Sequence, residues 1–148
     1  MRKLQTAALF VFFVGMLTAA ADERKLPSPA KLTIDKTAGD LSGIYHVVGI
    51  ETNGKKYTTV ATIQRRGDGY VVIWTMGEIN TIGIGLRQSD TLSVGWTQPL
   101  DGKLVRGVTV YKVALENGNP KLTGRWMSMA FAGIANESLT FLKANTED

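Results

Sequence analysis

The sequence predicts an all-β protein, a single small eight-stranded antiparallel up-and-down (meander) barrel that follows an N-terminal signal peptide. Three observations predict this fold. Apolar residues alternate with polar ones in short segments from Leu41 onward, and no segment keeps a helical period for ten residues. Turn signals separate the segments, and connections of about two to five residues join only antiparallel neighbours. Closing such a meander into a barrel removes both exposed edges.

Residues 1–21 match an export signal. The chain begins with basic Met1-Arg2-Lys3, continues with an apolar run from Ala7 to Leu17, and then has the small residues Thr18 to Ala21. The apolar run is shorter than the roughly 20 residues that span a bilayer, which favours a cleaved signal over a membrane anchor. We therefore expect cleavage after Ala21 and a protein that is exported, either periplasmic or secreted.

Residues 22–40 are expected to form an extended linker before the domain. Pro27 and Pro29 favour extended or polyproline II backbone there. The barrel domain is expected over residues 41–144, and residues 145–148 form a short tail.

Each expected strand ends at a turn signal rich in Gly, Asn, Asp or Pro. In chain order the expected strands are Gly43 to Glu51 before Asn53-Gly54, Lys56 to Arg66 before Gly67-Asp68-Gly69, Tyr70 to Met76 before Gly77-Glu78, Asn80 to Arg87 before Gln88-Ser89-Asp90, Leu92 to Thr97 before Pro99 to Gly102, Val105 to Leu115 before Glu116 to Pro120, Leu122 to Met129, and Asn136 to Leu142. Asn-Gly is the strongest of these signals, because both residues tolerate the positive φ of a two-residue hairpin turn.

The alternation also assigns the two faces of the sheet. In the fifth segment Leu92, Val94 and Trp96 alternate with small polar residues, so the tryptophan side is expected inside. The same parity places the following residues inside: Tyr45, Val47, Tyr70, Val72, Trp74, Tyr111, Val113, Leu122, Trp126, Leu139 and Phe141. The fourth segment is ambiguous, since either its isoleucines or its glycines could face inward. Gly43, Gly107 and Gly124 share the inner face with the rings and would make room for them.

The candidate ligand-binding residues are the inward aromatic side chains and one inward carboxylate: Tyr45, Trp74, Trp96, Tyr111, Trp126 and Glu137. Converging Trp and Tyr side chains can stack on an apolar or aromatic ligand, while their N–H and O–H groups orient it. The same rings could equally fill the barrel, because eight strands enclose little space. Glu137 needs a partner inside, and it could either orient a ligand or accept a structural hydrogen bond.

The composition excludes several kinds of site. Without Cys and with one His, His46, the chain has no disulfide framework, zinc-thiolate site or multi-histidine metal site. The net charge of +4, or +2 without the signal peptide, is too small to indicate nucleic-acid binding. No catalytic motif appears, so we expect no enzyme activity, no catalytic residue, no cofactor and no metal.

A resemblance runs along nearly the whole domain. It is carried by Gly43-Ile44-Tyr45, Tyr57 to Ile63, Gly69 to Trp74, Gly83-Ile84-Gly85, Leu92 to Trp96, Gly107 to Tyr111, Leu122 to Trp126 and Glu137 to Phe141. With these strand-and-turn patterns the chain resembles a group of small exported bacterial β-barrel proteins, some of which are labelled fibronectin-binding. Members of that group tend to carry Gly where this chain has Thr59. The layout is also similar to the calycin-like barrels of the avidin and lipocalin type, with Tyr45 in place of the Trp of their G-x-W start.

Two functions are open at this point, beside a less favoured enzyme built on Glu137, His46 and tyrosines. The first is a non-enzymatic binding protein that holds a small apolar or aromatic molecule inside the barrel. The second is a module that binds an extracellular protein through its outer surface, as an adhesin or an enzyme inhibitor. The outward residues of that second function are Ile44, Val48, Ile50, Val108 and Val110, which could equally form a homodimer interface. Neither function involves nucleic acid or a membrane span.

Overall fold

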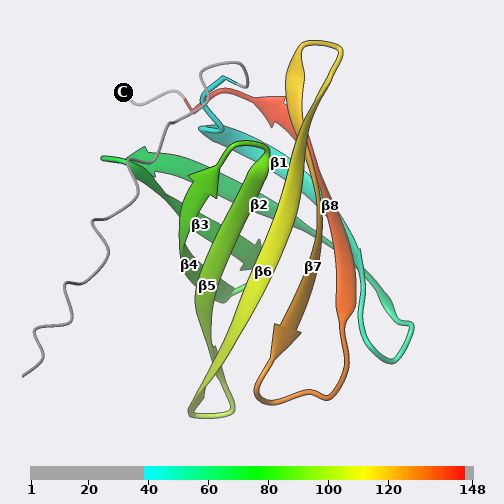
Figure 1. The fold of residues 1–148 in the computed structure, drawn as a ribbon. Coiled ribbons are helices and arrows are strands. Elements are labelled where there is room, and N and C mark those ends of the chain that lie inside the picture. The colour runs from blue at the N-terminus through cyan, green and yellow to red at the C-terminus, as the bar shows by residue number, and fades with distance from the viewer. Residues whose placement is uncertain (1–38, 146–148) are drawn as a thin grey trace, which may run out of the picture. The chain divides into compact units, whose positions relative to one another are not determined.

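Eight antiparallel strands form a closed barrel in up-and-down order, as the sequence predicts (Figure 1). The computed structural model describes residues 39–145, and the expected signal peptide and most of the linker and tail lie outside this range. Each strand pairs with its neighbours in the chain, and β8 pairs with β1 to close the barrel. The strands are β1 (Gly43–Ile50), β2 (Lys56–Arg66), β3 (Gly69–Met76), β4 (Ile79–Gln88), β5 (Thr91–Leu100), β6 (Lys103–Glu116), β7 (Asn119–Ser128) and β8 (Ala135–Lys143). Within residues 39–145 there is no helix long and apolar enough to cross a membrane.

Two hairpins are tighter than the sequence suggested. The turn between β5 and β6 consists of Asp101 and Gly102 alone, at φ values of 49° and 74°, and Pro99 already pairs with Leu104 in the ladder. Asn117 and Gly118 form the matching turn between β6 and β7. Two-residue turns with positive φ at both positions follow the right-handed twist of the strands, so the ladders extend into the segments expected as loops.

The inner face carries the residues that the alternation placed there. Tyr45, Tyr111, Leu92, Leu122 and Leu139 are fully buried, and Phe141 packs against this core from a half-buried position. Burial of these side chains is the main source of stability for a small barrel without disulfides.

The ambiguous strand β4 turns its glycines inward. A Cβ added to Gly83 would lie 2.6 Å from Val94 Cγ1, which leaves no room for a side chain at that position. Ile84 is 73% exposed and lies on the outer face between two glycines. Val94 and the Trp74 ring take the interior space beside Gly83, and Val94 and Leu92 take the space beside Gly85.

One end of the barrel is filled by the segment that precedes β1. Leu41 is fully buried, and its carbonyl oxygen accepts a hydrogen bond of 2.7 Å from the Tyr45 hydroxyl. The buried Arg87 donates to the carbonyl oxygen of Gly39 at 2.9 Å and so ties the same segment to β4. The Tyr45 ring meets Phe141 edge-on, with 5.5 Å between ring centroids. These contacts close the end that holds the β6–β7 turn, at the top of Figure 1.

We predict that Leu41→Ala lowers the free energy of unfolding by about 2–5 kcal/mol, because it empties a fully buried position. Urea denaturation measures the change. The control is Leu86→Ala on the outer face, where the side chain is 66% exposed and the expected change stays within about 0.5 kcal/mol. Equal effects of the two substitutions would show that Leu41 does not close the barrel.

Candidate functional site

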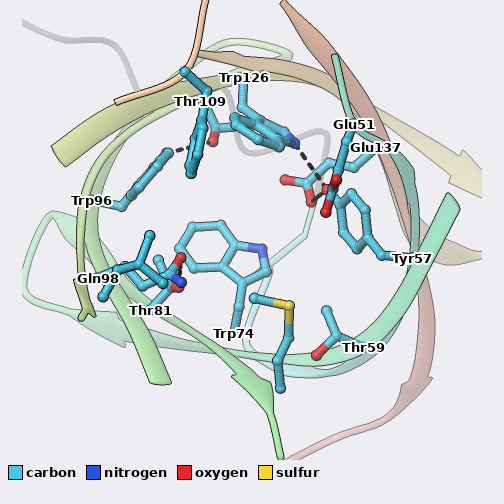
Figure 2. Close-up of a pocket in the computed structure, with 13 residues that line it drawn as sticks. Glu51, Tyr57, Thr59, Trp74, Thr81, Trp96, Gln98, Thr109, Trp126 and Glu137 are labelled. Atoms are coloured by element: carbon cyan, nitrogen blue, oxygen red, sulfur yellow. Dashed lines mark hydrogen bonds between the residues drawn. The ribbon is translucent and has the colours of Figure 1, made fainter. Parts of the chain in front are cut away.

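The opposite end of the barrel contains a cavity of about 260 Å³ (Figure 2). The turns β1–β2, β3–β4, β5–β6 and β7–β8 surround its mouth, and the last two lie at the bottom of Figure 1. The walls combine aromatic and aliphatic side chains with a few polar groups. The lining residues are Glu51, Tyr57, Thr59, Trp74, Met76, Thr81, Trp96, Gln98, Leu100, Thr109, Trp126, Phe131 and Glu137.

A buried carboxylate, Glu137, organises the polar side of the cavity. Tyr57 donates its hydroxyl hydrogen to Glu137 Oε2 at 2.8 Å, and Tyr111 donates to Oε1. The Trp126 indole N–H in turn donates to the Tyr57 oxygen at 2.9 Å. The hydrogen bonds therefore point from Trp126 through Tyr57 to Glu137, which acts as the acceptor for both phenols (Figure 2 draws the Trp126–Tyr57–Glu137 part).

The register of the ladders produces this arrangement. Across five strands, β2-β1-β8-β7-β6, the residues that pair in one row are Tyr57, Gly49, Glu137, Gly124 and Tyr111. Each tyrosine is separated from the glutamate by one glycine. A Cβ added to Gly49 would overlap the Tyr57 ring, and a Cβ on Gly124 would overlap the Tyr111 ring. Because glycine has no side chain, each phenol can pass over the backbone of its neighbouring glycine and reach the carboxylate of Glu137.

Burial governs the ionisation of this group. Desolvation raises the pKa of Glu137, and the hydrogen bonds from Tyr111 and Tyr57 offset part of that rise. Desolvation, and then the negative charge of Glu137, raise the pKa of Tyr57 and of Tyr111 well above that of free tyrosine. Both phenols therefore stay protonated at neutral pH and remain available as donors.

Away from the carboxylate, two hydrogen-bonded pairs and one contact between indoles hold the cavity wall. Trp96 donates its N–H to Thr109 Oγ1 at 3.1 Å and meets Trp126 edge-on, with 6.0 Å between ring centroids. Thr81 donates to Gln98 Oε1 at 3.0 Å. These contacts hold the side chains around the space without filling it.

Trp74 lies on the cavity wall, and its indole N–H is buried. Its buried Nε1 makes no hydrogen bond of standard geometry within residues 39–145. The indole lies near the Tyr111 hydroxyl, and its polar interaction there offsets part of the rise in the pKa of that phenol. A buried N–H normally has an acceptor, and this interaction points to the Tyr111 hydroxyl as the partner.

The structure distributes the six candidate residues over three places. Trp74, Trp96, Trp126 and Glu137 line the cavity. Tyr111 is fully buried behind Glu137 and acts through its hydrogen bond to that carboxylate. Tyr45 does not line the cavity, because its side chain lies at the closed end of the barrel.

Six polar lining residues are absent from the sequence-based candidates: Glu51, Tyr57, Thr59, Thr81, Gln98 and Thr109. Tyr57 has the parity of the buried Ala61 and Ile63 on β2, so alternation carried to the start of that strand places it inside. Glu51 follows Gly49 by two residues and continues the inward parity just beyond the end of β1. Tyr57 and Glu51 both lie beside a turn, where the alternation begins or ends, so the pattern indicated their inward side only weakly.

The outer face does not form the single apolar patch that the sequence suggested. Val48 and Ile50 on β1 and Val108 and Val110 on β6 are exposed, and Ile44 is half-buried. The two pairs are separated by β7 and β8, where Thr123, Arg125, Asn136 and Ser138 face outward, although Met127 beside Val108 is apolar and exposed. Exposed apolar side chains gather instead on β4 and β6, on either side of small β5 residues such as Gly95: Ile82, Ile84, Leu86, Val108 and Val110.

His46 lies on the outer face of β1 and is exposed, as its parity predicts. In the part of the chain that the structure describes, no three His, Asp or Glu side chains gather in a way that could hold a metal ion.

Comparison of the chain with protein-family models, with curated proteins and with solved structures finds no match. The function must therefore be inferred from the cavity itself.

We predict that Gly124→Ala lowers the free energy of unfolding by about 1–3 kcal/mol, because its Cβ would push the Tyr111 ring off Glu137. Gly95→Ala is the matched control, since nothing lies within 4 Å of its Cβ position on the outer face. That control should be neutral or stabilising, by at most about 1 kcal/mol. Urea denaturation of the two variants would contradict this account if Gly124→Ala were as stable as Gly95→Ala.

We also predict that stability relative to Glu137→Gln falls as the pH rises from about 4.3, the ordinary pKa of glutamate. The folded protein holds the Glu137 proton more tightly than the unfolded chain, because burial raises its pKa. Raising the pH then releases protons from the unfolded state first and favours unfolding, until the folded pKa is passed. Denaturation midpoints of both proteins between pH 4 and pH 8 measure this difference. A difference that grows in favour of the wild type with pH would contradict it.

Proposed function

We propose that this protein is a non-enzymatic binding protein that holds one small aromatic molecule in the cavity at the open end of its barrel. The observation that carries the proposal is the cavity of about 260 Å³ among three tryptophans, which opens at one end of the barrel. A cavity of about 150 Å³ is enough for benzene. The space here therefore suits a substituted single ring or a fused pair of rings.

The chemistry of the walls supports an aromatic ligand. The rings of Trp74, Trp96 and Trp126 offer faces and edges for stacked or edge-to-face contact. Few polar groups reach the space, and those that do are fixed by hydrogen bonds to their neighbours. A largely apolar pocket with a few positioned polar groups is typical of small-molecule sites.

The contrast between the two ends also supports binding. At the end near Leu41 the inward side chains are buried against one another in the hydrophobic core. At the other end Trp96 and Tyr57 are held against glycines at the walls, which leaves the middle open. The signal peptide that the sequence predicts would export the protein, so the protein would bind its ligand outside the cytoplasm.

The alternative is a module that binds an extracellular protein, or a second copy of the chain, through its outer sheet face. The exposed apolar residues of β4 and β6 support this alternative. It requires no ligand in the cavity, so a direct binding measurement separates the two functions.

We predict that the neutral probe 1-naphthalenemethanol binds the wild-type protein and that Leu100→Trp abolishes binding by filling the cavity. Leu100 lines the space near its mouth, at the end of β5. Isothermal titration calorimetry measures binding, and thermal denaturation checks that the variant folds.

Leu104→Trp is the matched control, because Leu104 lies across the same hairpin but is 57% exposed on the outer face. It should bind the probe as the wild type does. If neither this probe nor its positively and negatively charged analogues bind the wild type, the ligand-binding cavity is refuted and the outer face is left as the candidate surface.

A further inference from the structure

We infer that the ligand of this cavity is a cation, an aromatic molecule that carries a protonated amine, and that its ammonium group binds at Glu137. This inference rests on the proposed function and adds the chemical class of the ligand. It follows from the charges, the free acceptor sites and the aromatic surfaces of the walls.

The cavity has carboxylates and no positive charge of its own. Glu137 is 6% exposed, and Glu51 stands at the mouth, close enough to raise the pKa of Tyr57. None of the described lining residues is Lys, Arg or His. The groups that face Glu137 are the neutral phenols of Tyr57 and Tyr111, and neither supplies a counter-charge. A buried carboxylate without a cation is costly, and an ammonium ligand would supply the missing charge.

The carboxylate also has acceptor capacity left. A carboxylate has about four lone-pair sites, and the two phenols occupy one on each oxygen. Glu137 lines the cavity, so a ligand can reach it from the inside. An ammonium group can donate to the free sites without displacing either tyrosine, and such charge-assisted hydrogen bonds are the strong ones.

The rings around the carboxylate favour a cation for a second reason. Indole is the best aromatic partner for a positive charge, and the electrostatic attraction grows when the pair is removed from water. Trp74, Trp96 and Trp126 surround the space in front of Glu137 (Figure 2). An anionic ligand would meet the negative ring faces and two carboxylates, and a neutral ligand would leave Glu137 without a counter-charge.

The test uses three probes of the same shape and different charge: 1-naphthalenemethylamine, 1-naphthalenemethanol and 1-naphthoate. Calorimetry at pH 7 with the full protein should rank the amine first and the naphthoate last. We expect the amine to bind at least about tenfold more tightly than the alcohol, the gain typical of a hydrogen bond to a charged group.

Substitution of Glu137 tests whether this carboxylate causes the preference for the amine over the alcohol. In Glu137→Gln the ratio of amine to alcohol affinity should fall about tenfold, while the side chain keeps its size. The control is Glu78→Gln, an exposed residue of the β3–β4 turn outside the cavity lining, which should keep the wild-type ratio. Glu51→Gln should lower the ratio by a smaller factor, since Glu51 is only half-buried, and it provides the test at a second carboxylate if Glu137→Gln does not fold.

The outcomes separate the two proposals. If the alcohol binds and the amine binds no better, the cationic ligand is refuted and the binding cavity stands. An unchanged ratio in a folded Glu137→Gln also refutes the role of that carboxylate. If none of the three probes binds, the proposed function fails and the cationic ligand fails with it.

Discussion

The architecture of the cavity depends on satisfying one buried carboxylate. Glu137 lies on the inner face of β8, where its charge has lost its hydration and gains two phenol donors in return. Those donors come from β2 and β6, on opposite sides of β8. They can reach it because glycines occupy the intervening positions on β1 and β7, so the electrostatic requirement at one residue fixes four others in the same row.

Glycine also lies beneath an aromatic ring at the hollow end of the barrel. Trp96 lies over Gly107 on the neighbouring strand, and a side chain at that glycine would overlap the indole. A ring that lies flat against the wall occupies less of the centre than one that projects across it. At the closed end Leu41, Tyr45 and Phe141 meet one another and fill the middle instead. A ring also lies over a glycine at the closed end, where Phe141 covers Gly43, so the filled middle there depends on the buried Leu41.

The two phenols leave the negative charge of Glu137 without a positive partner, and this determines the kind of ligand that we propose. They satisfy hydrogen-bond acceptors on Glu137, but they carry no charge, so the cavity remains negative and aromatic. A ligand with a ring and an ammonium group complements both properties at once. The ammonium group of such a ligand would form an ion pair with Glu137 in a preformed site. Folding has already removed water from the carboxylate, so ligand binding would not need to do so.

The sequence alone predicted the barrel, the number of its strands and the inward parity of Trp74, Trp96, Trp126 and Glu137, because period-two alternation and turn residues are local signals. It could not decide which face of β4 is inside, since glycine and isoleucine there alternate equally well and only the packing of neighbouring strands, chiefly Val94 and Leu92 of β5, excludes a side chain. It also could not separate Tyr45 at the closed end from the residues of the cavity. Alternation tells which face of the sheet a residue lies on, but it does not tell the height of that residue along the barrel axis. The tertiary structure decided that height through the register of the ladders, which places Tyr57, Glu137 and Tyr111 in one row although they lie far apart in the chain. Register between strands depends on pairing around the whole barrel, so no single segment of the sequence contains it.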